Sequence, residues 1–253
     1  MKHIFPLLLC AGLLGLFAAC QSEADLRPKA SATGQLMLGG AYAEPFASGT
    51  TRATQTVTDL SAFTFRLVGT DTDGQEVDQR ITFQDNRCTL PTGTYTLHVD
   101  NYAAAIRGPG APYYSGITPS FTIGEDATQT LAIDLGSPKN ARVDIRLDAS
   151  FSELYENFSI AFEDAAQRRF RIYAPGSVYV MVPEGESIPY TLRATARKGT
   201  HVADLPAGGV SGTLTVQPGK AHPLTLSAQG IRDLLLLQFG EGTHAGEFDA
   251  RPF

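Results

Sequence analysis

The stretch Val143-Asp144-Ile145-Arg146-Leu147-Asp148 alternates apolar and charged residues without interruption. Successive side chains of an extended strand point to opposite faces, so Val143, Ile145 and Leu147 share one face and the charged residues share the other. This period of two predicts a strand with one buried and one exposed face.

The same alternation recurs along most of the chain. It is found at residues 63–67, 81–83, 95–99, 121–123, 131–135, 158–162, 170–172, 178–182, 190–194, 214–216 and 224–226. Turn sequences such as Thr70-Asp71-Thr72-Asp73-Gly74 and Pro91-Thr92-Gly93 separate these segments. The 25 Gly and 15 Pro also favour strands and turns over helices. The sequence therefore predicts an all-β protein of the sandwich type.

The two halves of the chain resemble each other. Pro91-x-Gly93 followed by Tyr95-Thr96-Leu97 recurs as Pro183-x-Gly185 followed by Tyr190-Thr191-Leu192. The segment Ser137-Pro138-Lys139-Asn140 lies between the halves and has the composition of a domain boundary. We expect two tandem β-sandwiches, at residues 34–137 and 138–253, and chance similarity between turn–strand units is the alternative.

Three segments lack a clear period of two. Gln35–Leu38 is expected to open the first strand, and Ala41–Thr58, rich in Ala, Thr and Ser, is expected to be a loop or an insertion. Ile231–Phe239 is expected to be a last, doubly buried C-terminal strand, because its leucine run is short for a helix. The tail from Gly240 is expected to fray.

The N-terminus has the pattern of an export signal. An apolar run from Ile4 to Ala19 follows Lys2, and it is too short and too interrupted to span a membrane comfortably. The residues Leu16-Phe17-Ala18-Ala19-Cys20 resemble the lipobox of bacterial lipoproteins, although Phe17 replaces the usual Leu. The resemblance implies a signal peptide at 1–19 that is removed and acyl chains on Cys20. An ordinary secretory signal with a chance cysteine is the alternative.

Acylation would hold the mature protein on a membrane. Each buried methylene contributes about 0.8 kcal/mol, so two or three acyl chains anchor a protein durably. Residues 20–33 are polar and small, as expected of a lipidated tether. The acidic residues after Cys20 faintly resemble the surface-export signal of Bacteroidota lipoproteins, which would place the protein on the outer membrane at the cell surface.

The charge and the cysteines exclude several classes of function. With 20 Lys and Arg against 26 Asp and Glu, the chain has a net charge of −6, which argues against nucleic acid as a partner. If Cys10 leaves with the signal and Cys20 is acylated, Cys88 is the one remaining thiol. Neither a disulfide within the chain nor a thiolate metal cluster is then expected.

No catalytic or metal-binding motif is found in the sequence. Asp71-x-Asp73-Gly74-x-Glu76-x-Asp78 has some features of a calcium loop but lacks the full ligand set, so we interpret it as an Asp-Gly hairpin turn. The histidines have no metal-ligand spacing, and there is no Gly-x-Ser-x-Gly elbow. We therefore expect a protein without enzymatic activity, metal or cofactor.

Several of these motifs together resemble a known family. They are Pro91-Thr92-Gly93-Thr94-Tyr95, Tyr113-Tyr114-x-Gly116, and Asn140-x-x-Val143-x-Ile145 followed by Phe158-Ser159-Ile160. On these the chain resembles uncharacterised Bacteroidota lipoproteins with the domain of unknown function 4493, which are similar to fimbrillin-like surface proteins. The resemblance implies tandem transthyretin-like or fimbrillin-like β-sandwiches on the cell envelope.

Two hypotheses about function follow. In the first, the protein is a non-enzymatic binding or adhesin-like module, and exposed Tyr113 and Tyr114 stack on a glycan or a protein partner; packing of these tyrosines onto the sandwich is the alternative. Arg168, Arg169 and Arg171 are expected to form a solvated strand edge rather than a binding patch.

The second hypothesis is a fimbrial subunit precursor. The resemblance to fimbrillin-like proteins implies cleavage after an N-terminal arginine, here Arg52 in Thr51-Arg52-Ala53. Self-assembly by strand donation would follow. An arginine in an ordinary polar loop is the alternative.

Overall fold

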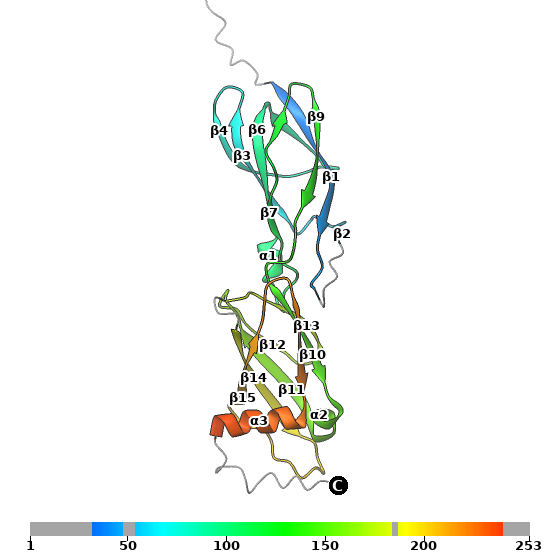
Figure 1. Ribbon diagram of the computed structural model, residues 1–253, viewed down its shortest axis with the longest axis vertical. Helices are drawn as coiled ribbons and strands as arrows, with labels where there is room; N and C mark the ends of the chain where they lie inside the picture. The colour runs from blue at the N-terminus through cyan, green and yellow to red at the C-terminus, as the bar shows by residue number, and fades with distance from the viewer. Residues whose placement is uncertain (1–31, 48–53, 184–186, 240–253) are drawn as a thin grey trace, which may run out of the picture. The chain divides into compact units, whose positions relative to one another are not determined.

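The computed structural model describes residues 32–47, 54–183 and 187–239, and of residues 234–239 only the backbone. These residues form sixteen strands and three helices (Figure 1). Two separate hydrophobic cores lie within them, one in each half of the chain. The predicted all-β class with two tandem sandwiches is confirmed.

The first sandwich consists of two sheets. In one sheet, β1 lies in the middle, antiparallel to β5 and β2 and parallel to β9. In the other, β3 pairs with β4 and β6, and β6 pairs with β7 and β8. The bounds are β1 Thr33–Ala43, β2 Gln55–Thr56, β3 Thr64–Asp71, β4 Glu76–Ile81, β5 Arg87–Pro91, β6 Gly93–Asp100, α1 Tyr102–Ala105, β7 Ser115–Ile117, β8 Phe121–Ile123 and β9 Thr128–Asp134.

The second sandwich also consists of two sheets. In one, β10 is antiparallel to β13 and parallel to β16, and in the other β11 pairs with β12 and β14, and β14 with β15. The bounds are β10 Ala141–Leu147, α2 Ala149–Leu154, β11 Tyr155–Glu163, β12 Arg169–Ile172, β13 Gly176–Val180, β14 Ser187–Ala196, β15 Val210–Thr215, β16 Ala221–Leu226 and α3 Ala228–Phe239.

The two sandwiches share one order of strand pairing. β1 and β10 each pair with an antiparallel strand, β5 or β13, and with a parallel strand, β9 or β16, and β1 also pairs with the short β2. Likewise β3 and β11 each lie between two antiparallel strands, β4 and β6 or β12 and β14. This correspondence supports the repeat that the sequence predicted, while the bounds 34–137 and 138–253 stay a proposal.

The expectation of a loop over Ala41–Thr58 is wrong at both ends. β1 continues to Ala43, and β2 forms at Gln55–Thr56. The pairing of β1 with β9 shifts between Leu38 and Gly40, and this bulge changes which residues face the core. Leu36 and Leu38 are buried before the bulge, and Ala41 and Ala43 after it. The buried positions therefore change from even to odd numbers, and a strict period of two does not extend over the whole strand.

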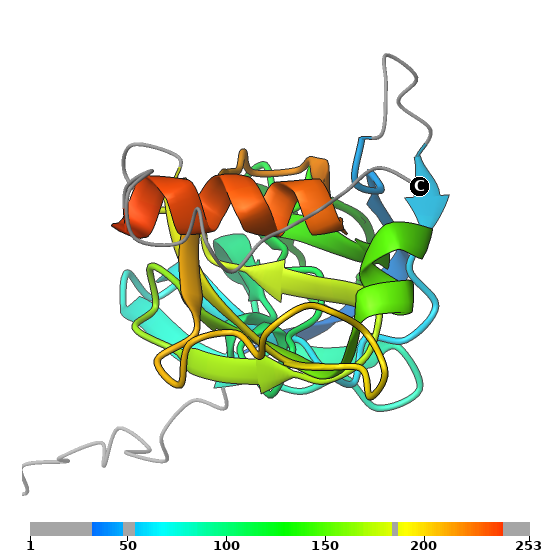
Figure 2. The same cartoon turned by 90° about the horizontal axis from the view of Figure 1, so that it is seen from below.

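The expected C-terminal strand at Ile231–Phe239 is also wrong, because α3 occupies Ala228–Phe239. Ser227 is the N-cap residue of this helix, because its Oγ accepts a hydrogen bond from the N–H of Gly230 at 3.0 Å. Leucine has a high helix propensity, and tertiary packing stabilises the short helix, which lies against α2 and β15 (Figure 2). No helix in the described part of the chain is long and apolar enough to cross a membrane.

A buried tyrosine fixes the connection between the two sheets of the first sandwich. Tyr95 is 1% exposed, and its hydroxyl donates to the carbonyl oxygen of Pro91 at 3.1 Å. Gly93 lies under this ring, where a Cβ would come within 2.6 Å of the tyrosine hydroxyl and 2.5 Å of the carbonyl oxygen of Thr70. The Pro91-Thr92-Gly93 turn is therefore a glycine position for reasons of space.

Candidate functional site

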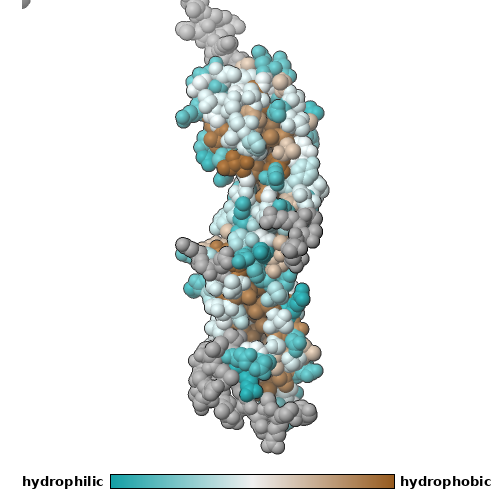
Figure 3. Space-filling model, in the orientation of Figure 1, coloured by the Kyte–Doolittle hydropathy of each residue, from teal (hydrophilic) through white to brown (hydrophobic). Residues whose placement is uncertain are grey.

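A cleft with a volume of about 460 Å³ opens at the edge of the first sandwich. The chain entering β3 forms one wall, and the chain leaving β4 forms the other. The apolar lining residues are Leu38, Leu60, Phe63, Phe65, Ile81 and Phe83, and the polar ones are Thr58, Ser61, Thr64, Arg80, Thr82 and Asn86. Hydrophobic residues gather on the surface of this sandwich in Figure 3.

A tight turn holds the wall that follows β4. Asp85 and Asn86 have φ angles of 49° and 61°, a conformation that Asp and Asn tolerate better than most residues. Gln84 and Arg87, on either side, donate backbone hydrogen bonds to each other at 2.9 Å. The carbonyl oxygen of Asn86 accepts the N–H of Leu38 at 2.9 Å, which fixes the turn onto β1.

Local contacts also hold the opposite wall. The N–H of Phe63 donates to the carbonyl oxygen of Leu60 at 3.0 Å, and the carboxylate of Asp59 accepts the N–H of Ser61 at 2.9 Å. Hydrogen bonds from Ser61 lower the pKa of Asp59. Phe65 is buried and meets Phe83 edge-to-face, with ring centroids 5.0 Å apart. Both rings therefore sit in defined positions across the cleft.

Arg80 is the one charged residue among the described residues that line the cleft. Arg80 is exposed and lies directly opposite Arg66 in the pairing of β3 with β4. Arg66 holds both carboxylate oxygens of Asp78, with Nε at 2.6 Å from Oδ1, and this lowers the pKa of Asp78. No carboxylate among the described residues pairs with Arg80.

The predicted ligand-contact tyrosines make contacts within the protein. Tyr114 is 6% exposed, and its hydroxyl donates to the carbonyl oxygen of Glu44 at 3.1 Å. The hydroxyl of Tyr113 donates to Asp100 at 3.0 Å, and its ring packs edge-to-face on Tyr102. Burial raises the pKa of both hydroxyl groups. Tyr114 thus offers no open ring face for stacking, and the ligand role of the pair stays a prediction.

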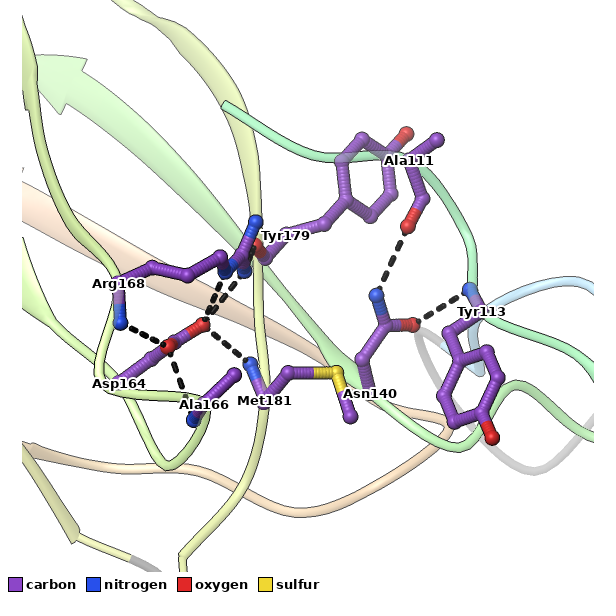
Figure 4. A network of polar contacts seen from close by, with 8 residues as sticks. All are labelled: Ala111, Tyr113, Asn140, Asp164, Ala166, Arg168, Tyr179 and Met181. Atoms are coloured by element: carbon purple, nitrogen blue, oxygen red, sulfur yellow. Dashed lines mark hydrogen bonds and ion pairs between the residues drawn. The ribbon is translucent and has the colours of Figure 1, made fainter. Parts of the chain in front are cut away.

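The predicted boundary segment ends in a fully buried residue, Asn140 (Figure 4). Its side-chain oxygen accepts the N–H of Tyr113 at 3.0 Å, and its side-chain nitrogen donates to the carbonyl oxygen of Ala111 at 2.8 Å. Its own carbonyl oxygen accepts the N–H of Gly219 at 2.8 Å. Asn140 therefore joins the segment of Ala111 and Tyr113 in the first half to the second half.

The chain after β1 makes a second set of such contacts. The ring of Phe46, 8% exposed, lies 5.5 Å from the ring of Tyr179 and 5.8 Å from the guanidinium of Arg142. The N–H of Ala47 donates to the carbonyl oxygen of Gly219 at 2.9 Å. β1 is thus continuous with a segment that packs on the second sandwich.

The expected solvated arginine edge is wrong for Arg168. Its side chain is 12% exposed and lies on the carboxylate of Asp164, which is fully buried (Figure 4). Arg168 also donates to the carbonyl oxygen of Tyr179 at 2.8 Å, and Asp164 accepts the N–H of Met181 at 2.9 Å. Arg169, 80% exposed and paired with Glu163, fits the expectation. The sequence places an Asp four residues before Arg168, but this spacing predicts a contact on a helix, whereas residues 164–168 form the turn between β11 and β12.

The metal-loop alternative finds no support in the geometry. Asp71 Oδ1 accepts the N–H groups of Asp73 and Gln75 at 3.0 and 2.8 Å, so this carboxylate caps the β3–β4 hairpin turn. Within the described ranges, no three His, Cys, Asp or Glu side chains gather as a metal site would need. Cys88 is a free thiol, and burial raises its pKa. Cys20 and Arg52 lie outside the described residues.

Comparisons with known proteins extend over both sandwiches. The model of the domain of unknown function DUF4493 matches residues 32–242. The chain is similar to the structure of a candidate cell adhesion protein from Bacteroides fragilis, with 13% identity, coverage of 78% of this chain and 92% of that one, and a TM-score of 0.40.

Two further solved structures are similar at this level. One is a candidate adhesin from Bacteroides ovatus, with 11% identity, coverage of 85% and 96%, and a TM-score of 0.38. The other is the shaft pilin SpaA from Lactobacillus rhamnosus GG, with 9% identity, coverage of 77% and 97%, and a TM-score of 0.38. No curated protein sequence matches the chain.

Replacing Asp164 by Ala is expected to destabilise the second sandwich by about 3 to 5 kcal/mol, because the guanidinium of Arg168 would stay buried without its partner. The measurement is urea unfolding followed by circular dichroism, since the chain has no Trp. Glu163→Ala, which removes the neighbouring exposed ion pair, is the control and should change stability by less than about 0.5 kcal/mol. Equal effects of the two variants would contradict the interpretation.

Proposed function

We propose that this chain, which belongs to the family of the domain of unknown function DUF4493, is a non-enzymatic binding module of the cell envelope. Its ligand would enter the cleft of the first sandwich. The observation that carries the proposal is the cleft itself, which has aromatic walls and a polar rim. Its volume of about 460 Å³ falls within the range of small-ligand sites.

The chemistry of the lining favours binding over catalysis. Among the described lining residues there is no carboxylate, histidine or thiol that could act as a nucleophile or as a general base. Arg80 is the charged residue among those that line the cleft. Such a lining can hold and orient a ligand.

The anchor is the second part of the proposal. Acyl chains on Cys20 would hold the protein on the outer membrane at the cell surface, and the residues before β1 would act as the tether. The lipobox-like residues Leu16–Cys20 support this. The anchor and the cleft lie in separate parts of the chain, so each can be tested alone.

Cells fed labelled palmitate should label the wild-type protein but not Cys20→Ala, because only the first keeps the acyl-acceptor thiol. Cys20→Ala should also move from the membrane fraction to the soluble fraction. Cys88→Ala, which removes the half-buried thiol of β5, is the matched control and should stay labelled. Equal labelling of Cys20→Ala and wild type would rule out this anchor.

Blocking the cleft should abolish binding. The mature Cys20→Ala protein is applied to an array of glycans and peptides, and at least one class of probe is expected to bind. Thr82→Trp places a large ring at the exposed rim and should weaken that binding at least tenfold, whereas Thr122→Trp, at an exposed position on β8, should not. Binding to no probe, or equal binding by both variants, would contradict the proposal.

One observation favours the fimbrial alternative, namely the position of β1. This strand precedes Arg52 in the chain and lies between β9 on one side and β5 and β2 on the other. Cleavage after Arg52 would remove it, leaving the edges of β5 and β9 unpaired and the places of Leu36 and Leu38 empty. A strand from a second copy could fill such a groove.

If this alternative holds, Arg52→Ala should block the appearance of a product that begins at Ala53, together with any SDS-resistant ladder. N-terminal sequencing and unboiled gels measure both. Arg107→Ala, which changes another exposed arginine of the first half, should leave processing intact. A mature protein that always begins at Cys20 would exclude the alternative.

A further inference from the structure

We infer that the cleft binds a sugar residue that carries a carboxylate, with the carboxylate on Arg80 and the ring between Phe63 and Phe83. The inference rests on the proposed function and names its class of ligand. It draws on three features of the cleft, which are its charge, its aromatic walls and its rim of hydroxyl groups.

The positive charge of Arg80 at the cleft favours an anionic ligand. Arg80 and Arg66 are directly opposite each other on β4 and β3, and like charges in this position repel. Asp78 places both of its oxygens on Arg66, so it relieves one guanidinium only. A ligand carboxylate can accept two parallel hydrogen bonds from the guanidinium of Arg80. This contact would add the missing negative charge.

The aromatic walls suit the apolar faces of a sugar ring. Phe63 and Phe83 are half-buried, and both line the cleft. Phe83 is held by the edge-to-face contact with Phe65, so its orientation does not depend on a ligand. A ring that enters between these walls meets surfaces already in place, which lowers the entropic cost of binding.

The rim supplies partners for hydroxyl groups. Thr82 and Asn86 are exposed at the cleft and offer both donors and acceptors. A sugar ring carries several hydroxyl groups, each both donor and acceptor, and can pair with these side chains while its apolar faces contact the aromatic walls. The volume of about 460 Å³ suits a single sugar residue with its substituents rather than a long chain.

Isothermal titration of the mature Cys20→Ala protein tests the inference. The probes are di- and trisaccharides of galacturonic and glucuronic acid, and the corresponding galactose and glucose oligomers serve as neutral controls. The acidic probes should bind at least tenfold more tightly than the neutral ones, and the difference should shrink as salt is raised. A short polyglutamate peptide is the probe for the acidic-peptide alternative and should bind more weakly than the uronates.

Variants assign the effect to the cleft. Arg80→Gln should weaken uronate binding at least tenfold and leave any neutral-sugar binding unchanged. Arg87→Gln removes an exposed charge just beyond the same turn and should change little. Because Arg80 is exposed, its replacement should leave thermal unfolding as in wild type, and this is checked by circular dichroism.

Three results would overturn the inference. They are neutral sugars binding as tightly as uronates, uronate binding that survives Arg80→Gln, and polyglutamate binding more tightly than any uronate. Its failure differs from failure of the proposed function. If neutral glycans bind and Thr82→Trp abolishes that binding, the binding module stands and the acidic ligand falls. If nothing on the array binds, the proposed function falls as well.

Discussion

The pairing of β1 with β9, β5 and β2 supports most of the first sandwich. Leu36 and Leu38 of this strand lie in the core, and the N–H of Leu38 holds the turn at Asn86 that forms one wall of the cleft. Beyond its end, Phe46 and Ala47 pack on the second sandwich. The strand therefore connects the core, the cleft and the contacts between the two halves.

Because the cleft depends on β1, processing that removes this strand would also disrupt the cleft. Removal of β1 after cleavage at Arg52 would take away Leu38, which lines the cleft, and the hydrogen bond that fixes Asn86. It would also remove the contact of Phe46 with Tyr179. A processed chain would regain the cleft only if an incoming strand restored both the side chain and the N–H at the place of Leu38.

Alternation in the sequence predicted the strands that have one regular buried face, such as β3, β6, β10 and β11. It lost β1 at the bulge near Gly40, where one extra residue moves the apolar positions to the other parity. It also predicted a strand where α3 forms, because a short leucine run fits a helix or a strand. It gave no sign of the ion pair between Asp164 and Arg168, which forms in a turn. Alternation also predicted strands that include Phe63 and Phe83, but these residues lie just outside β3 and β4. The pattern of apolar residues does not show that both side chains are left half-buried at a cleft.

The cleft lies where the repeat diverges. β3 and β11 hold the same place in the strand order, but the chain enters them differently. Helix α2 precedes β11, and its Phe151, 1% exposed, packs against Tyr155 and Phe158. The described residues that enter β3, 54–63, form no helix, and Phe63 stays half-buried beside an open volume. Among the described residues that lead into β3, 54–63, no helix matches the one that completes the core of the second sandwich, and the aromatic walls stay open to a ligand.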